Sequence, residues 1–116
     1  MKKRCVLLSI YVDEDEKRGR KPLYRAILDL LWEKDIHGVT VFKGVYGYGP
    51  DKKVHTARLL RASENLPVKI EVVETLEKVK EILPELEALI TRGLITVTEL
   101  LLLSHKSPPC EEARKP

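Results

Sequence analysis

The residues best suited to binding chemistry gather in one glycine-rich, basic segment near the middle of the chain. Gly47 and Gly49 flank Tyr48, and Lys52 and Lys53 follow shortly after. Glycines let backbone amides approach an anion closely, and lysines supply the charge that attracts phosphate. A short Gly-x-Gly is also typical of ordinary tight turns, and the residues alone favour that interpretation, with an anion-binding loop as the alternative. Tyr46 and Tyr48 bracket Gly47 and could either pack within the turn or stack on a purine ring.

Further cations border the last apolar segment of the chain. Arg92 and Gly93 precede this segment, and Lys106 follows it. A cation at a helix end complements the helix dipole, which would explain Arg92 without any ligand. The alternative is that Arg92, Gly93 and Lys106 converge with the basic loop on one anion.

The remaining reactive residues do not form a recognisable catalytic or metal-binding pattern. The three histidines lie far apart, and no nucleophile occupies a strained elbow. Glu71 and Glu74 could work as an acid and a base if they were buried, but their surroundings favour a solvated face. We therefore expect a non-enzymatic protein with no metal.

The composition is typical of one small domain. The 116 residues are 43% hydrophobic and 34% charged, and the longest nearly apolar run, residues 94–103, is about half the length that spans a bilayer. A net charge of +3 is too small to indicate a nucleic-acid partner. We expect a cytoplasmic protein without membrane insertion. The absence of glutamine and the abundance of lysine, arginine and glutamate favour a thermophilic source.

Hydrophobic periodicity predicts the order β-α-β-loop-β-α-β. The expected strands cover residues 4–12, 39–46, 68–73 and part of 94–104. The first helix follows Pro22 and ends near residues 37–38; the second is capped by Thr75 and ends near residues 92–93. Residues 54–65 have weaker helical spacing. Pro84 should kink or divide the second helix, whose expected apolar positions are Leu76, Val79, Leu83, Leu86 and Ile90.

This order predicts an α+β fold, a ferredoxin-like βαββαβ sandwich with a four-stranded antiparallel sheet and two helices on one face. The domain is expected over residues 1–106, with a loose tail over residues 107–116. Cys5 and Cys110 lack the spacing of a metal or redox motif, so two separate thiols are favoured. A bridge between the first strand and the tail is the alternative, because the last strand would run beside the first.

Several short segments together resemble the PII-like uncharacterised protein family, domain of unknown function one-ninety. The similarity spans about residues 4 to 104 and rests on the combination of motifs. The matching motifs are Pro22-Leu23-Tyr24, Gly38-Val39-Thr40-Val41, Gly44, Gly47-Tyr48-Gly49, His55-Thr56, Leu66-Pro67-Val68 and Gly93-Leu94-Ile95-Thr96-Val97.

That family is similar to the PII nitrogen-signalling proteins, and the resemblance implies their general plan. It implies a homotrimer that binds an adenine nucleotide (ATP, ADP or AMP) or another small anion between subunits. It also implies an effector loop, here residues 47–66, that contacts a transporter or enzyme. Thr40 matches a threonine near the adenine, Gly47 and Gly49 match the base of the loop, and Gly93 matches the glycine after the second helix.

The sequence departs from PII proteins after Gly93. PII proteins have a Lys-Ile-Gly-Asp-Gly-Lys stretch there, whereas this chain has Leu94 to Glu99, so both glycines are absent and a carboxylate replaces the last lysine. Glu99 beside a triphosphate would add like-charge repulsion. Leu59 lies near the position of the tyrosine that some PII proteins have uridylylated, so regulation by that modification is not expected.

Three functional hypotheses follow from the residues and the resemblance. The first is a non-enzymatic, PII-like signalling protein that senses a small molecule. The second is a small trimeric enzyme or metal-tolerance-type protein on the same fold, which would need a cluster of titratable side chains in the cleft. The third is a purely structural assembly module, because one fold carries many functions.

Overall fold

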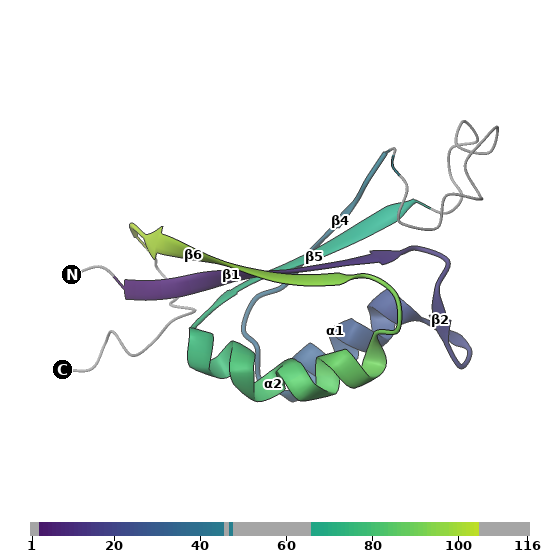
Figure 1. The fold of residues 1–116 in the computed structure, drawn as a ribbon, viewed down its shortest axis with the longest axis horizontal. Coiled ribbons are helices and arrows are strands. Elements are labelled where there is room, and N and C mark those ends of the chain that lie inside the picture. The colour runs from purple at the N-terminus through teal and green to yellow at the C-terminus, as the bar shows by residue number, and fades with distance from the viewer. Residues whose placement is uncertain (1–2, 46, 48–65, 105–116) are drawn as a thin grey trace.

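Four strands form one antiparallel sheet that carries two helices on one of its faces (Figure 1). The computed structural model describes residues 3–45, 47 and 66–104. The sheet order is β4-β5-β1-β6, the topology of the predicted ferredoxin-like α+β sandwich, which is confirmed. The elements are β1 (Lys3–Asp13), β2 (Lys17–Arg18), β3 (Lys21–Pro22), α1 (Leu23–Glu33), β4 (Thr40–Lys43), β5 (Pro67–Glu74), α2 (Leu76–Leu89) and β6 (Leu94–Leu102).

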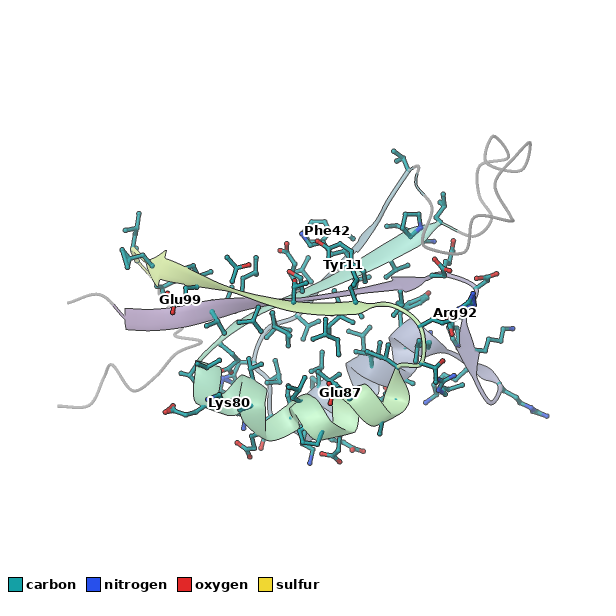
Figure 2. The ribbon with its side chains drawn as sticks, viewed as in Figure 1. Tyr11, Phe42, Lys80, Glu87, Arg92 and Glu99 are labelled. Carbon is teal, nitrogen blue, oxygen red and sulfur yellow. The ribbon has the colours of Figure 1, made fainter. Side chains whose placement is uncertain are left out.

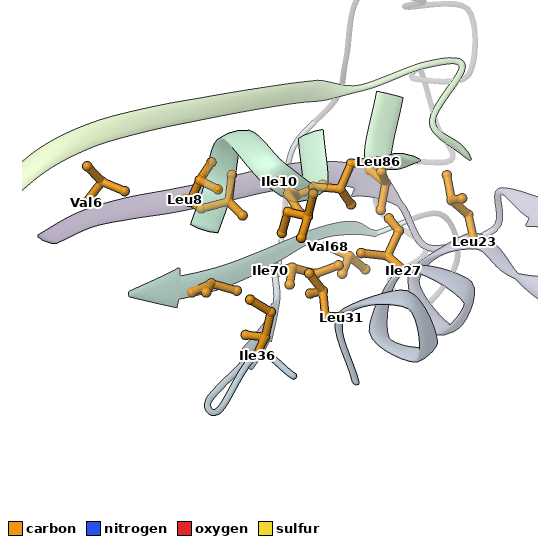
Figure 3. Packing of buried hydrophobic residues seen from close by; sticks show 14 residues of the cluster. Val6, Leu8, Ile10, Leu23, Ile27, Leu31, Ile36, Val68, Ile70 and Leu86 are labelled. Carbon is orange, nitrogen blue, oxygen red and sulfur yellow. The ribbon is translucent and has the colours of Figure 1, made fainter. Parts of the chain in front are cut away.

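The core lies between the helices and the two central strands, β1 and β5. Alternate residues of a strand point to opposite faces, so β1 turns Leu8 and Ile10 toward the helices. In register with them on β5 are Val72 and Ile70, and all four side chains are buried. Figure 3 shows this apolar layer meeting residues of α1 and α2. The predicted alternation of these strands is therefore correct.

Helix α1 packs on the sheet through Leu23, Ile27 and Leu31, which are fully buried. The helix ends at Glu33, earlier than predicted. Asp35 adopts a left-handed backbone with φ 63°, a conformation that aspartate tolerates better than most residues. The Ile36 amide then donates to the Leu31 carbonyl over 3.1 Å, and the Ile36 side chain returns to the core.

Helix α2 begins as predicted, but it ends at Leu89 and not near residues 92–93. Of its predicted apolar positions, Leu76 is exposed. The Lys78 amide donates to the Thr75 hydroxyl over 3.1 Å, which confirms the cap. The helix passes through Pro84 without being divided. This proline is exposed, so the carbonyl that loses its partner one turn earlier is accessible to water. The buried stripe contains Ile82 in place of the predicted Leu83, which is only partly buried.

Smaller features also differ from the prediction. Residues 17–22, between β1 and α1, form the short β2–β3 hairpin, which the predicted order of elements did not contain. Strand β4 is shorter than predicted, and Gly44 follows it directly. The weak helix over residues 54–65 and the tail over residues 107–116 lie outside the described residues. The boundary of the domain at residue 106 therefore stays a prediction.

Neither helix has the length and apolarity needed to cross a membrane, as far as the described residues go. The longer one, α2, has 14 residues, whereas a spanning helix needs about 20. Its outward side also carries exposed charged residues, including Lys80 and Glu87 (Figure 2).

Cys5 corrects the expectation of two separate thiols. It is buried in β1 and is disulfide-bonded. The sequence offered a bridge only as the alternative, on the ground that the last strand would run beside the first. The structure has that arrangement, because the end of β6 lies beside the start of β1, with Cys5 opposite Leu100. Cys110, the other cysteine of the chain, lies outside the described residues.

Gly93 occupies a position that only glycine fits. Its φ is +138°, and a Cβ atom there would collide with the carbonyl oxygen of Tyr11. We expect Gly93→Ala to lower the free energy of unfolding by about 2 kcal/mol or more, because it adds both a steric clash and backbone strain. Gly38→Ala is the matched control, since a Cβ at Gly38 meets nothing within 4 Å. Denaturant unfolding of both variants measures the difference, and equal stabilities would contradict this account.

Candidate functional site

The open face of the sheet contains a hollow at the end from which the 44–66 connection leaves. Its volume is about 370 Å³. It lies on the side of the sheet opposite the helices, where Tyr11 and Phe42 rise from the strands (Figure 2). The lining residues are Tyr11, Phe42, Gly44, Pro67, Val68, Lys69 and Glu71.

Strand register places a lysine between two aromatic side chains in this hollow. Lys69 on β5 is opposite Tyr11 on β1 and opposite Phe42 on β4. The Lys69 Nζ atom lies 5.5 Å from the centre of the Tyr11 ring, within the range of a cation–π interaction. The three side chains thus form a row across the strands, with one ammonium group flanked by apolar rings.

A carboxylate forms an ion pair with the lysine of this row. Glu71, two residues further along β5, forms an ion pair of 2.8 Å with the Lys69 ammonium. This hydrogen bond raises the pKa of Lys69 above its ordinary value, and the ammonium would be charged at neutral pH even without it. The hollow therefore offers flat apolar surface, a cation and an acceptor, which suits a small ligand with a ring and polar groups.

The structure places three predicted site residues around this hollow. Thr40 is opposite Glu71 in the β4–β5 register. A Cβ atom on Gly47 would lie 3.3 Å from the Pro67 ring. Gly93 packs against the backbone of Tyr11. Each of the three is thus next to a residue that lines the hollow.

The predicted residues do not all converge within one chain. Thr40 belongs to β4, whereas Arg92 and Gly93 precede β6, and these strands are the two opposite edges of the sheet. Adjacent strands lie about 4.8 Å apart, so the two edges are about 14 Å apart across β5 and β1. Figure 2 likewise shows Arg92 at the turn between α2 and β6, away from Phe42.

The other predicted ligand residues cannot be placed. Tyr48, Gly49, Lys52, Lys53 and Lys106 lie outside the described residues, and their roles stay predictions. Among the residues that are described, no three His, Cys, Asp or Glu side chains come together as a group able to hold a metal ion.

The glutamates considered as an acid–base pair have separate roles. Glu74 is 6% exposed, and its Oε1 accepts a hydrogen bond of 3.0 Å from the Thr75 amide. The expectation of a solvated face is wrong for this residue. Glu71 instead pairs with Lys69. An odd sequence separation puts the two carboxylates on opposite faces of β5, so they cannot act together on one ligand.

Sequence reasoning missed Tyr11, Phe42 and Lys69 as members of one site. Each residue by itself resembles an ordinary position on an exposed strand face. Only the register of β1, β5 and β4 aligns them, and a register depends on pairing between strands that are distant in sequence. A usable signal was the polar–apolar alternation of β5, which marks Lys69 and Glu71 as residues of one face.

Comparison with solved structures identifies the class of fold as PII-like. The apo form of CPII, a nitrogen regulatory PII-like protein from Thiomonas intermedia K12, has a TM-score of 0.61 at 15% identity over 88% of this chain and 95% of that protein. CPII bound to ADP, AMP and bicarbonate has a TM-score of 0.60 at 16% identity over 91% of this chain and all of that protein. At such identities the similarity concerns the fold alone.

Sequence comparison gives the family. The model of DUF190, described as Uncharacterized ACR, matches residues 5–101. A UPF0166 protein of Aquifex aeolicus is 35% identical over 94 residues, which is 81% of this chain and 89% of the relative. A UPF0166 protein of Methanocaldococcus jannaschii is 38% identical over 97 residues, 83% of this chain and 89% of the relative. The chain belongs to the DUF190 family, as its motifs predicted.

The Lys69–Glu71 pair gives a measurable prediction. In Glu71→Gln we expect the pKa of Lys69 to fall toward its ordinary value, because the largest cause of its rise is the hydrogen bond to this carboxylate. Stability from a raised lysine pKa is present below the ordinary value and is lost as the pH rises through the folded value. NMR titration of labelled lysine side chains measures the shift. Glu87→Gln, on the helix side, should leave the pKa of Lys69 unchanged.

Proposed function

We propose that this protein is a non-enzymatic, PII-like sensor of a small anionic molecule. Its working form is a homotrimer that binds an adenine nucleotide or a smaller anion, such as bicarbonate, between neighbouring subunits. Binding changes the effector loop at residues 47–66, which then contacts a partner protein. The ligand controls the loop only if it binds two states of the loop with different affinity.

The separation of the predicted ligand residues carries this proposal. Thr40 lies on the β4 edge of the sheet, and Arg92 precedes the β6 edge. Within one chain these two groups are therefore on opposite edges, about 14 Å apart at the usual strand spacing. A ring of copies that sets the β4 edge of one subunit beside the β6 edge of the next would assemble them. Each ligand would then contact two subunits, which links binding to assembly.

The chemistry of the hollow supports an adenine nucleotide or a small anion as the ligand. Aromatic rings favour stacking with a flat base. The Lys69 ammonium attracts negative charge, and its ion pair with Glu71 offsets part of that attraction. The PII-like protein CPII has been solved bound to ADP, AMP and bicarbonate, which makes these compounds the first to test. Lys69 is thus the ligand residue that we add to those expected from the sequence.

Exposed apolar residues at both sheet edges support assembly of several copies. Phe42 on β4 is 48% exposed, and Leu94 on β6 is 58% exposed. Both strands have one side without a paired strand in the described sheet. Such edges readily pair with another chain unless they are protected. A partner subunit would also add core to a domain of this size.

Ligand titration tests the sensing function directly. We expect at least one of ATP, ADP, AMP, cyclic nucleotides or bicarbonate to raise the melting temperature, with a matching heat in calorimetry. Lys69→Met should weaken that binding about tenfold or more, since a charge-assisted contact contributes roughly 1.5–3 kcal/mol. Lys80→Met, on α2, is the control and should bind like the wild type. If none of these ligands stabilises the protein, the sensor function is wrong.

The mass in solution tests the assembly. Light scattering should give three times the 13.3 kDa of one chain. Leu94→Lys places a charge on the β6 edge, and we expect it to lower the oligomer fraction strongly. Leu103→Lys is the control, because Leu103 is 82% exposed and lies beyond the end of β6. A wild-type monomer, or equal effects of the two variants, would contradict an interface at this edge.

A further inference from the structure

One carboxylate touches both ends of the connection between β4 and β5. Glu14 Oε2 forms an ion pair of 2.7 Å with Nζ of Lys43, the last residue of β4. The Glu14 amide donates to the Leu66 carbonyl over 2.9 Å, and the Leu66 amide approaches Glu14 Oε1 at 3.4 Å. Leu66 directly precedes β5. Glu14 therefore joins the last residue of β4 to the residue that precedes β5.

These contacts connect strands that are not neighbours. Glu14 follows β1, which pairs with β5 but not with β4. At the usual strand spacing β1 and β4 are about 10 Å apart. The side chains of Glu14 and Lys43 together span this distance between β1 and β4, and they do so at the end of β5. The contact thus adds a direct link between the end of β4 and the segment after β1, beyond the backbone ladders that each strand forms with β5.

The ends of the loop are also held together by backbone contacts. The Gly44 amide donates to the Pro67 carbonyl over 2.7 Å. A Cβ atom on Gly44 would lie only 2.7 Å from Cγ of Pro67, so the approach requires glycine. We call Lys43, Gly44, Leu66 and Pro67 the loop neck. Glu14 contacts the neck on the side of β1.

Hydrogen bonds to both helices hold the segment that carries Glu14, which is the connection between β1 and α1. The Leu23 amide donates to the Glu16 carbonyl over 2.7 Å, which anchors the segment at the start of α1. Arg18 Nε donates to the Leu89 carbonyl over 2.9 Å, and its Nη2 donates to Thr91 Oγ1 over 3.1 Å. The connection between β1 and α1 is therefore fixed at both helices. A carboxylate on such a support orients its partners at little entropic cost.

The pKa shifts of Glu14 and Lys43 agree with this geometry. The hydrogen bond to Lys43 is the largest cause that lowers the pKa of Glu14, and the same bond raises the pKa of Lys43. The Glu14 side chain is 24% exposed and that of Lys43 is 52% exposed, so solvent screens part of the attraction and the contact depends on its geometry as well as on charge. Both groups are charged at neutral pH, when the interaction is at full strength.

We propose that Glu14 is a positioning residue for the effector loop: it clasps the loop neck and thereby fixes the points at which β4 ends and β5 begins. The proposal rests on the proposed function only where it calls this segment an effector loop. Glu14, which belongs to the acidic run at residues 13–16, thereby gains a specific structural role. Loss of the clasp should loosen the neck while the core stays folded.

Hydrogen exchange of the ligand-free protein tests the clasp. Glu14→Gln preserves shape and an acceptor oxygen but removes the charge, and we expect exchange at the Gly44 and Leu66 amides to rise about two- to fivefold. Glu14→Ala removes the acceptor as well and should raise it further. Exchange in the central strands β1 and β5 should stay at the wild-type rate, which separates loss of the clasp from general unfolding.

A matched control uses another ion pair of the chain. Lys34 and Glu85 form a pair of 2.6 Å between the end of α1 and α2, so Glu85→Gln removes a comparable contact away from the neck. It should leave exchange at Gly44 and Leu66 unchanged. Unaltered neck exchange in both Glu14 variants would overturn the proposal. A rise that Glu85→Gln reproduces, or that β1 and β5 share, would overturn it too.

The outcome is independent of ligand binding. If the neck loosens in the Glu14 variants but no nucleotide or bicarbonate binds the wild type, the clasp stands and the sensor function fails. If a ligand binds and the neck does not respond to Glu14, the sensor function stands and the clasp fails. When both hold, Glu14→Gln should also change the affinity for the ligand that stabilises the wild type.

Discussion

The burial of β1 between two strands and beneath two helices is the constraint on which the rest of the molecule depends. Leu8 and Ile10 have no exposed surface, and a slip of one residue would turn both out of the core. The register of β1 with β5 and β6 is therefore fixed. Because strand faces alternate, the same register sets which residues occupy the open face. The core thus determines the candidate site on the other side of the sheet.

Because the core fixes the strand register, the candidate site can be built from side chains that form no motif in the local sequence. Tyr11 is one residue after the buried Ile10, and Lys69 is one residue before the buried Ile70. Each faces outward because its neighbour faces inward. The Gly93 turn, which has room for no Cβ beside Tyr11, lets β6 start close against β1. The ends of three strands and one turn are thereby brought within reach of the hollow.

The sequence was sufficient for the features that depend on local periodicity. Alternation located β1 and β5 to within one or two residues, and Thr75 marked the start of α2 correctly. In the buried stripe of α2 the sequence predicted Leu83, whereas the buried residue is Ile82. Both residues fit a step of three or four positions along a helix, and only packing on the sheet decides between them. The β2–β3 hairpin has two-residue strands, which are too short for any period. Glu14 could not be recognised because its partners, Lys43 and Leu66, are distant in sequence.

The strand register also changes the effect on anion binding that is expected of Glu99. The alignment with PII proteins places this carboxylate where a phosphate-binding lysine is expected, which predicts repulsion of an anion. In the β1–β6 register Glu99 is opposite Val6, a residue of the helix-facing side. Lys69 belongs to the other face, in register with Tyr11. Figure 2 places Glu99 far along β6 from Tyr11 and Phe42. Within one chain, Glu99 and the Lys69 hollow are thus separated by the sheet itself, and the carboxylate does not oppose an anion bound beside Lys69.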